Sequence, residues 1–151
     1  MTIFDKFNEK FNASKLAEEV KELGSNNRQQ GDYEDVPFGM YEVKVEKMEL
    51  KESKSGRPMV SIWFRIIEGD FKNSIIFMNQ VVEQPFQIHI VKELLAALES
   101  GLDIEFVDYN QFNDLLLDIH QAIDGKLEYA LDYQENDKGF NVFKIKEVYE
   151  V

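Results

Sequence analysis

The chain has no cysteine and only two histidines, and both shortages limit its chemistry. Without cysteine there is no disulfide, no thiolate ligand for zinc or an iron–sulfur cluster, and no thiol nucleophile. His89 and His120 belong to no His-x-x-x-His or His-Glu-x-x-His pattern, so we expect no metal site. Gly-rich phosphate loops and a Gly-x-Ser-x-Gly nucleophile motif are also missing. These absences predict a protein that is not an enzyme and that has no cofactor.

Long hydrophobic runs are missing as well. No stretch approaches the roughly 18 uninterrupted apolar residues of a membrane-spanning helix, and the first residues lack the pattern of a signal peptide. With 151 residues, of which 44% are hydrophobic and 30% charged, the chain is long enough to bury a core without disulfides. We therefore expect a cytosolic globular protein that does not bind membranes.

Basic residues are scarce, because 17 Lys and Arg stand against 29 Asp and Glu, for a net charge of −12. Such a balance argues against a general nucleic-acid binder. The charge is unevenly distributed, however. Residues 83–125 hold nine acids and one base, whereas residues 37–82 hold seven bases and six acids. The sequence therefore predicts one strongly acidic surface and another that can still accept phosphates.

The spacing of apolar residues separates an N-terminal helix with its linker, residues 1–36, from a domain at residues 37–151. Phe4, Phe7 and Phe11 recur at helical spacing, and a glycine and a polar stretch follow the helix. An amphipathic helix of this kind usually packs on its own domain. The alternative is that it contacts another copy or a partner.

Alternation of apolar and polar residues predicts the strands of the domain. Five strands are expected, at about residues 41–50, 60–67, 74–82, 127–134 and 140–148. In the first strand the apolar phase slips by one near Glu46 and Lys47, which predicts a β-bulge there.

Helical spacing returns between the third and fourth strands. Two helices are predicted within residues 85–125, and Asp108 and Gln111 form a variant of the capping box before the second helix. Three strands, a helical connection and two more strands are the order of a small oligonucleotide-binding barrel, the OB fold. The predicted fold is α+β, a five-stranded OB-like β-barrel with an N-terminal helix and a helical insertion at residues 85–125.

Trp63 and Arg65 share one face of the second predicted strand, opposite an aliphatic face. A rigidly held aromatic ring with nearby cations can stack a base and contact phosphate. We therefore expect a nucleic-acid site built from Trp63, Arg65, Lys44, Lys54, Arg57, Lys72, Phe71 and Phe140. Two other interpretations remain. Trp63 could pack against the N-terminal helix under Arg65, and the alternating charges could be an ordinary solvated strand edge.

Three short motifs carry a resemblance to a known family. They are Gly39-Met40-Tyr41, Lys54-Ser55-Gly56-Arg57-Pro58-Met59 and Glu68-Gly69-Asp70-Phe71-Lys72. With its predicted N-terminal helix, the chain resembles small bacteriophage and prophage single-stranded DNA-binding proteins of the OB-fold type. The resemblance implies a role in phage replication or recombination, replication or recombination proteins as partners, and a place in the cytoplasm of a bacterial host cell.

Two functions are therefore favoured, and an enzyme with a pocket that the sequence does not reveal is a third hypothesis. The first is single-stranded DNA binding without sequence specificity, for which four phosphate-contacting cations would give log K against log salt a slope of about −3. The second is an acidic protein-interaction module or DNA mimic, which would use residues 83–125 to bind a basic partner. We expect self-association in both cases, because repeated subunits help a weak site to act and the N-terminal helix offers a contact.

Overall fold

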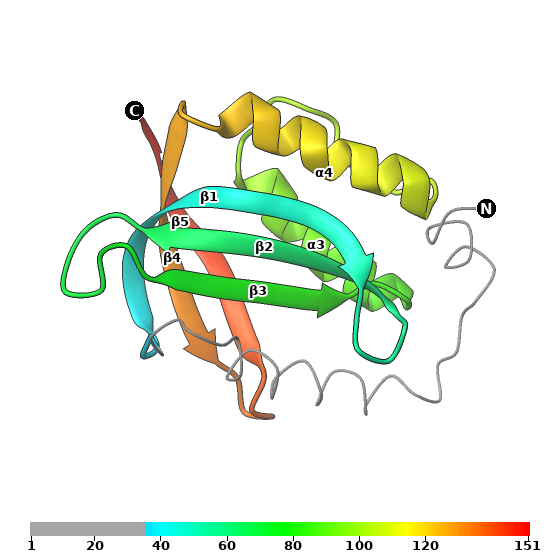
Figure 1. Ribbon diagram of the computed structural model, residues 1–151, viewed down its shortest axis with the longest axis horizontal. Coiled ribbons are helices and arrows are strands. Elements are labelled where there is room, and N and C mark those ends of the chain that lie inside the picture. The colour runs from blue at the N-terminus through cyan, green and yellow to red at the C-terminus, as the bar shows by residue number, and fades with distance from the viewer. Residues whose placement is uncertain (1–35) are drawn as a thin grey trace.

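The computed structural model describes residues 36–151 (Figure 1). The predicted N-terminal helix and nearly all of its linker lie outside the described residues. The elements are strands β1 (Gly39–Glu52), β2 (Pro58–Ile66) and β3 (Ile75–Val81), helices α3 (Pro85–Ala97) and α4 (Tyr109–Ile123), and strands β4 (Leu127–Glu135) and β5 (Asn141–Glu150). Their order and approximate bounds confirm the prediction for residues 37–151, including the two helices between the third and fourth strands.

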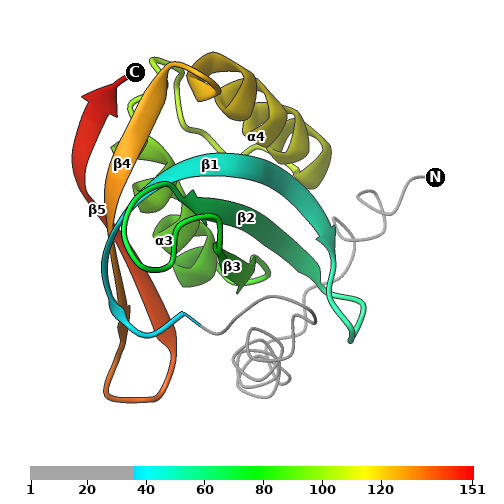
Figure 2. The same ribbon diagram turned by 60° about the vertical axis from the view of Figure 1, so that its left-hand side comes forward.

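The five strands form one open antiparallel sheet in the order β3-β2-β1-β4-β5. The prediction of a closed barrel was therefore wrong: no ladder joins β3 to β5 within residues 36–151. The physical reason is the position of α3. This helix follows β3 directly and contacts both β3 and β5, so it occupies the space between the two edges of the curved sheet (Figure 2).

Strand β1 is long enough to pair with two neighbouring strands. Its first residues, up to Val43, pair with β4, and the stretch from Val43 to Glu52 pairs with β2. The register between β1 and β2 shifts between Val45 and Lys47, which confirms the predicted bulge. The extra residue, Glu46, lets β1 bend, because a bulge increases the local twist of a strand.

Helix α4 covers the edge of β1 that β4 leaves open. The backbone N–H of Leu50 donates to Asn113 Oδ1 at 3.2 Å, and His120 Nε2 lies 3.2 Å from the carbonyl oxygen of Val45. The helix begins where Asp108 accepts a hydrogen bond from the Gln111 N–H at 2.8 Å. Side chains of α4 thus satisfy backbone groups that would otherwise be an exposed sheet edge.

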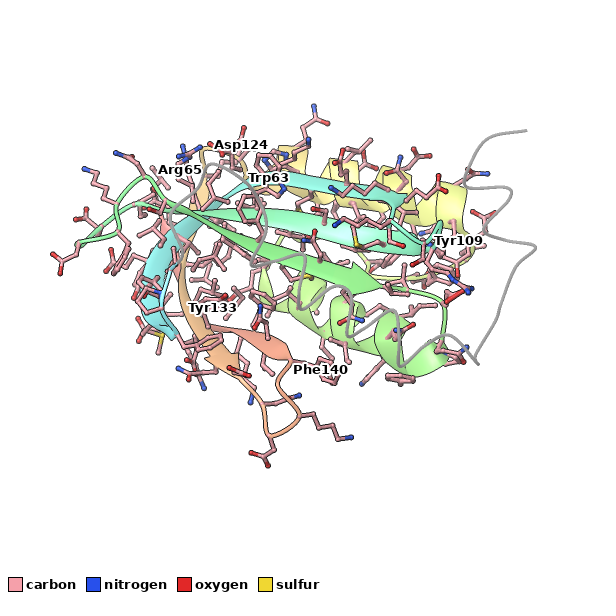
Figure 3. All side chains as sticks on the ribbon, turned by 60° about the horizontal axis from the view of Figure 1, so that its bottom comes forward. Trp63, Arg65, Tyr109, Asp124, Tyr133 and Phe140 are labelled. Atoms are coloured by element: carbon pink, nitrogen blue, oxygen red, sulfur yellow. The ribbon has the colours of Figure 1, made fainter. Side chains whose placement is uncertain are left out.

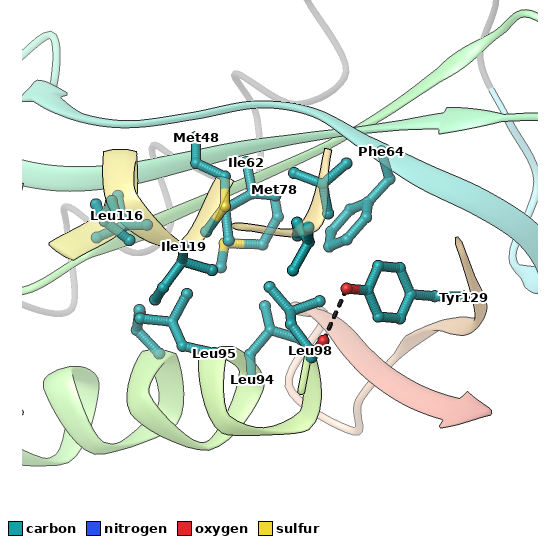
Figure 4. Packing of buried hydrophobic residues seen from close by; sticks show 14 of the residues in the cluster. Met48, Ile62, Phe64, Met78, Leu94, Leu95, Leu98, Leu116, Ile119 and Tyr129 are labelled. Carbon is teal, nitrogen blue, oxygen red and sulfur yellow. Dashed lines mark hydrogen bonds between the residues drawn. The ribbon is translucent and has the colours of Figure 1, made fainter. Parts of the chain in front are cut away.

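The hydrophobic core lies between one face of the sheet and the two helices (Figure 4). Both helices pack on this same face, hereafter the core face. Its fully buried members from the strands and helices include Met48, Ile62, Phe64, Leu95, Leu98, Leu116 and Ile119. Burial of each such side chain contributes roughly 1.5–3 kcal/mol, so this layer supplies most of the stabilisation of the domain.

Candidate nucleic-acid interface

The opposite side of the sheet, hereafter the outer face, carries the predicted site. In the β1–β2 ladder, Lys44 lies opposite Arg65, Lys47 opposite Trp63, and Lys51 opposite Met59. Directly opposed residues project to the same side of an antiparallel pair. The residues next to them along each strand, such as Val45 and Phe64, belong to the core. Three lysines of β1 therefore form a row beside Trp63, and we call Lys44, Lys47 and Lys51 the lysine row.

Trp63 is half-buried, and the contacts of its ring include a lysine and a phenylalanine. The Lys47 ammonium lies 4.9 Å from the ring centroid, a cation–π contact, and Lys47 also pairs with Glu49 at 3.4 Å. The ring of Phe77 on β3 meets Trp63 edge-on, with centroids 5.2 Å apart and an interplanar angle of 79°. The structure thus holds an aromatic ring and a cation together on a rigid strand, the two kinds of group that stack bases and contact phosphates.

Arg65 is held by a neighbouring carboxylate. Its Nε and Nη2 donate to the two carboxylate oxygens of Glu46 at 2.6 Å each, and its Nη1 donates to the carbonyl oxygen of Asn73 at 2.6 Å. The hydrogen bond from Arg65 lowers the pKa of Glu46. The guanidinium charge is therefore largely compensated by Glu46, and Arg65 serves to connect the bulge of β1 with the β2–β3 turn.

Arg57 lies apart from the outer-face row. Its Nη1 donates to Glu83 Oε2 at 2.6 Å, and the two side chains are only 10% and 1% exposed. The pair joins the β1–β2 turn to the start of α3, so Arg57 acts within the fold and does not present its charge to solvent. The pairing of Arg57 with Glu83 could not be predicted from sequence spacing, because the two residues are 26 positions apart in the chain.

The remaining predicted residues divide between the two ends of the sheet. Lys54 and Lys72 are exposed, in the β1–β2 and β2–β3 turns respectively. Phe71 is half-buried, meets Tyr41 edge-on at 6.2 Å and packs against the core. Phe140 is half-buried at the β4–β5 turn, well away from Trp63 (Figure 3). The structure therefore brings Lys44, Trp63 and Arg65 together but does not bring Phe140 to them.

The predicted site missed Lys47 and Lys51, which belong to the lysine row. The signal was present in the sequence, because the bulge at Glu46 shifts the register so that Lys47 comes opposite Trp63. From Lys44 to Lys54 the lysines follow β1 into its turn, a path of about 30 Å at the usual rise of a strand. Acidic residues Glu46, Glu49 and Glu52 interrupt this path, and Glu42 precedes it.

Among residues 36–151, no group of three or more His, Asp or Glu side chains is arranged to hold a metal ion. In the same part of the chain, none of the helices is long and apolar enough to cross a membrane.

Comparison with known proteins identifies the family. Residues 22–129 match a family described as a protein of unknown function, DUF669. The match extends from before β1 into β4 and includes the lysine row and Trp63. No curated protein matches the chain. Because the match covers well over half of the 151 residues, the chain belongs to the DUF669 family of proteins of unknown function.

Proposed function

We propose that the protein binds single-stranded DNA without sequence specificity along the outer face of β1 and β2. The observation that carries the proposal is the half-buried Trp63 ring beside the lysine row. Stacking of a base on an aromatic side chain contributes about 1–3 kcal/mol, and lysines that follow the backbone add an attraction that salt weakens. Both contributions are independent of base identity.

The strand order supports an OB-like interpretation of the sheet. OB domains are five-stranded, partly open barrels that bind oligonucleotides on strands two and three and on the loop between strands one and two. Here β2 carries Trp63, and the β1–β2 turn carries Lys54. Together with the resemblance of three short motifs to those of phage single-stranded DNA-binding proteins, this arrangement favours a role in phage replication or recombination.

The experiment is a titration of a fluorescently labelled dT oligonucleotide, followed by anisotropy at several salt concentrations. With three lysines contacting phosphate, we expect log K to fall with log salt at a slope of about −2. The triple substitution Lys44→Ala, Lys47→Ala, Lys51→Ala removes the row and should abolish most of that slope. Trp63→Ala should weaken binding by roughly 5- to 150-fold, as expected for the loss of one stacked base.

A matched control removes the same number of charges elsewhere. Lys92, Lys126 and Lys146 lie outside β1 and β2, and their triple substitution by alanine changes the net charge by the same amount. This control should bind about as well as the parent. The proposal fails if the parent does not bind at low salt, or if the control loses as much affinity as the variant of the lysine row.

A second function, binding of a basic partner, rests on the acidic half of the molecule. Among residues 36–151, five exposed acids around α3 and α4 have no ion pair: Glu99, Asp103, Glu105, Asp114 and Asp118. An acidic module or DNA mimic would compete with DNA for a basic protein and would have no affinity for DNA itself. The same titration, repeated with a basic competitor protein, separates the two functions.

A further inference from the structure

The outer face changes character between β1 and β3. On β1 it carries the lysine row, whereas on β2 and β3 it is mainly apolar. Met59 and Val81, directly opposed across the β2–β3 ladder, form a hydrophobic cluster separate from the main core. Ile75 and Phe77 lie on the same side of β3, because residues two apart on a strand share a face. The opposed buried polar residues Ser61 and Asn79 lie between Phe77 and Val81 on this face. We call Met59, Ile75, Phe77 and Val81 the apolar strip.

The apolar strip is buried although both helices pack elsewhere. Met59, Ile75 and Val81 are 5%, 2% and 0% exposed. Helices α3 and α4 contribute their buried residues to the cluster on the core face. Within residues 36–151, no helix or strand lies over the strip. The helices and strands of residues 36–151 therefore do not account for the burial of the strip.

We propose that the chain's own segment of residues 4–23 packs on the apolar strip and covers it. The segment has the required chemistry, because Phe4, Phe7 and Phe11 recur at helical spacing and Leu16, Val20 and Leu23 form a second helical stripe. The two stripes would lie on opposite sides of one continuous helix, so a break near Ser14, a candidate helix N-cap, turns both toward the sheet. Its length also fits. Twenty residues of helix span about 30 Å, and the seven residues of β3 span about 23 Å.

The connection to the domain allows this packing. About a dozen residues separate the segment from Val36, and such a linker reaches up to roughly 40 Å. Val36 itself packs against the core, next to the start of β1. The start of β1 lies beside the end of β2, since Val43 pairs with Ile66, and the start of β3 is at the same end, since Arg65 pairs with Ile75. The chain thus enters at one end of the strip.

This packing gives the outer face a defined boundary. Trp63 stands between the lysine row on β1 and Phe77 in the strip. The N-terminal segment would cover the side of Trp63 toward β3 and leave the row on β1 open. The inference does not depend on DNA binding, because it concerns how the chain packs on itself.

The test uses two single-cysteine proteins, which is straightforward because the chain has no native cysteine. Val81→Cys places a thiol in the apolar strip, and Val60→Cys places one on the core face of β2. Both valines are 0% exposed. The rate of reaction with a maleimide is measured for each thiol in the full chain, with and without Phe4→Ser, Phe7→Ser and Phe11→Ser. A control background carries Lys6→Ser and Glu9→Ser, on the opposite side of the helical spacing.

We expect the three serines to speed labelling of Val81→Cys by at least about ten-fold and to leave Val60→Cys slow, since local loss of a covering segment exposes only the strip. The control background should change neither rate. Equal acceleration of both thiols, or no acceleration of Val81→Cys, would overturn the proposal. So would protection of Val81→Cys that disappears on dilution, because the covering layer would then come from a second copy.

Discussion

Arg57 and Arg65 carry the same charge on neighbouring stretches of chain, but the structure gives them different environments. Arg57 pairs with Glu83 in the interior, and both side chains are almost fully covered. Arg65 pairs with Glu46 at the surface, where 26% and 32% of the two side chains are exposed. Two charges that are both buried depend on each other, because removal of one leaves the other without solvent or partner.

Breaking the buried pair should therefore be costly. Arg57→Met or Glu83→Gln should lower the free energy of unfolding by about 3–5 kcal/mol, whereas the double variant should lose less than the sum of the two. Urea denaturation at neutral pH measures each value. Glu46→Gln is the matched control at the partly exposed pair and should cost about 1 kcal/mol. Additive losses in the double variant would show that Arg57 and Glu83 act independently.

Residue types in the sequence indicated which side chains could contact a nucleic acid. They did not indicate which of these side chains would be occupied by partners within the protein. Trp63 was identified because it stands alone opposite an aliphatic face, a local pattern. The partners of Arg57 and Arg65 come from other parts of the chain. Tertiary packing determines which carboxylate pairs with each guanidinium. A neighbouring carboxylate can offset the charge of a lysine in the same way. Lys44, Lys54 and Lys72 nevertheless remain exposed to solvent.

At the scale of elements, the bulge in β1 determines what each half of the strand presents. Val43 and Val45 face the core before Glu46, and Met48 and Leu50 face it afterwards. Without the extra residue, the period of two would send the second half of the strand to the wrong side. The bulge also places Lys47 opposite Trp63. One inserted residue thus keeps the apolar residues of β1 in the core and places a lysine beside Trp63 in the candidate interface.

Deletion of Glu46 should therefore destabilise the domain strongly. Met48 and Leu50 would exchange places with lysines, and loss of their burial costs about 3–6 kcal/mol in total. Glu46→Ala keeps the bulge and removes only the partly exposed ion pair with Arg65 and its hydrogen bonds, so it should cost about 1 kcal/mol. Urea denaturation of both variants distinguishes these effects. A deletion no worse than the alanine substitution would mean that β1 can realign without the bulge.

For the whole molecule, two buried tyrosines connect layers that are distant in sequence. Tyr109, at the start of α4, donates to the carbonyl oxygen of Val82 at 2.8 Å. Tyr129, on β4, donates to the carbonyl oxygen of Leu98 after α3 at 2.8 Å, as Figure 4 shows. Burial raises the pKa of both hydroxyls above the ordinary value, and the charges of Glu83 and Glu99 add to this for Tyr109 and Tyr129 respectively.

These raised pKa values predict a loss of stability at alkaline pH. Above about pH 10 the unfolded chain releases the tyrosine protons while the folded chain retains them, so the free energy of unfolding falls by up to about 1.4 kcal/mol per pH unit for each tyrosine. Below that pH the contribution is fully present.

Tyrosine-to-phenylalanine variants isolate the effect. Tyr109→Phe and Tyr129→Phe should each cost about 0.5–1.5 kcal/mol at neutral pH, through loss of a hydrogen bond. Each should then lose less further stability than the parent between pH 10 and 12. Urea denaturation across this range tests the difference, and parallel curves for parent and variants would contradict the role of the buried hydroxyls.

The sequence by itself determined the order of elements, the bulge and the uneven charge, because periodicity, turn residues and composition act over short stretches of chain. Tertiary structure alone decided whether the sheet closes, since the outcome depends on α3 lying between β3 and β5. It also decided that Arg57 is buried against Glu83 and that Lys47 stands over Trp63. These arrangements arise from packing between elements far apart in sequence, where space and desolvation select one partner among several possible ones.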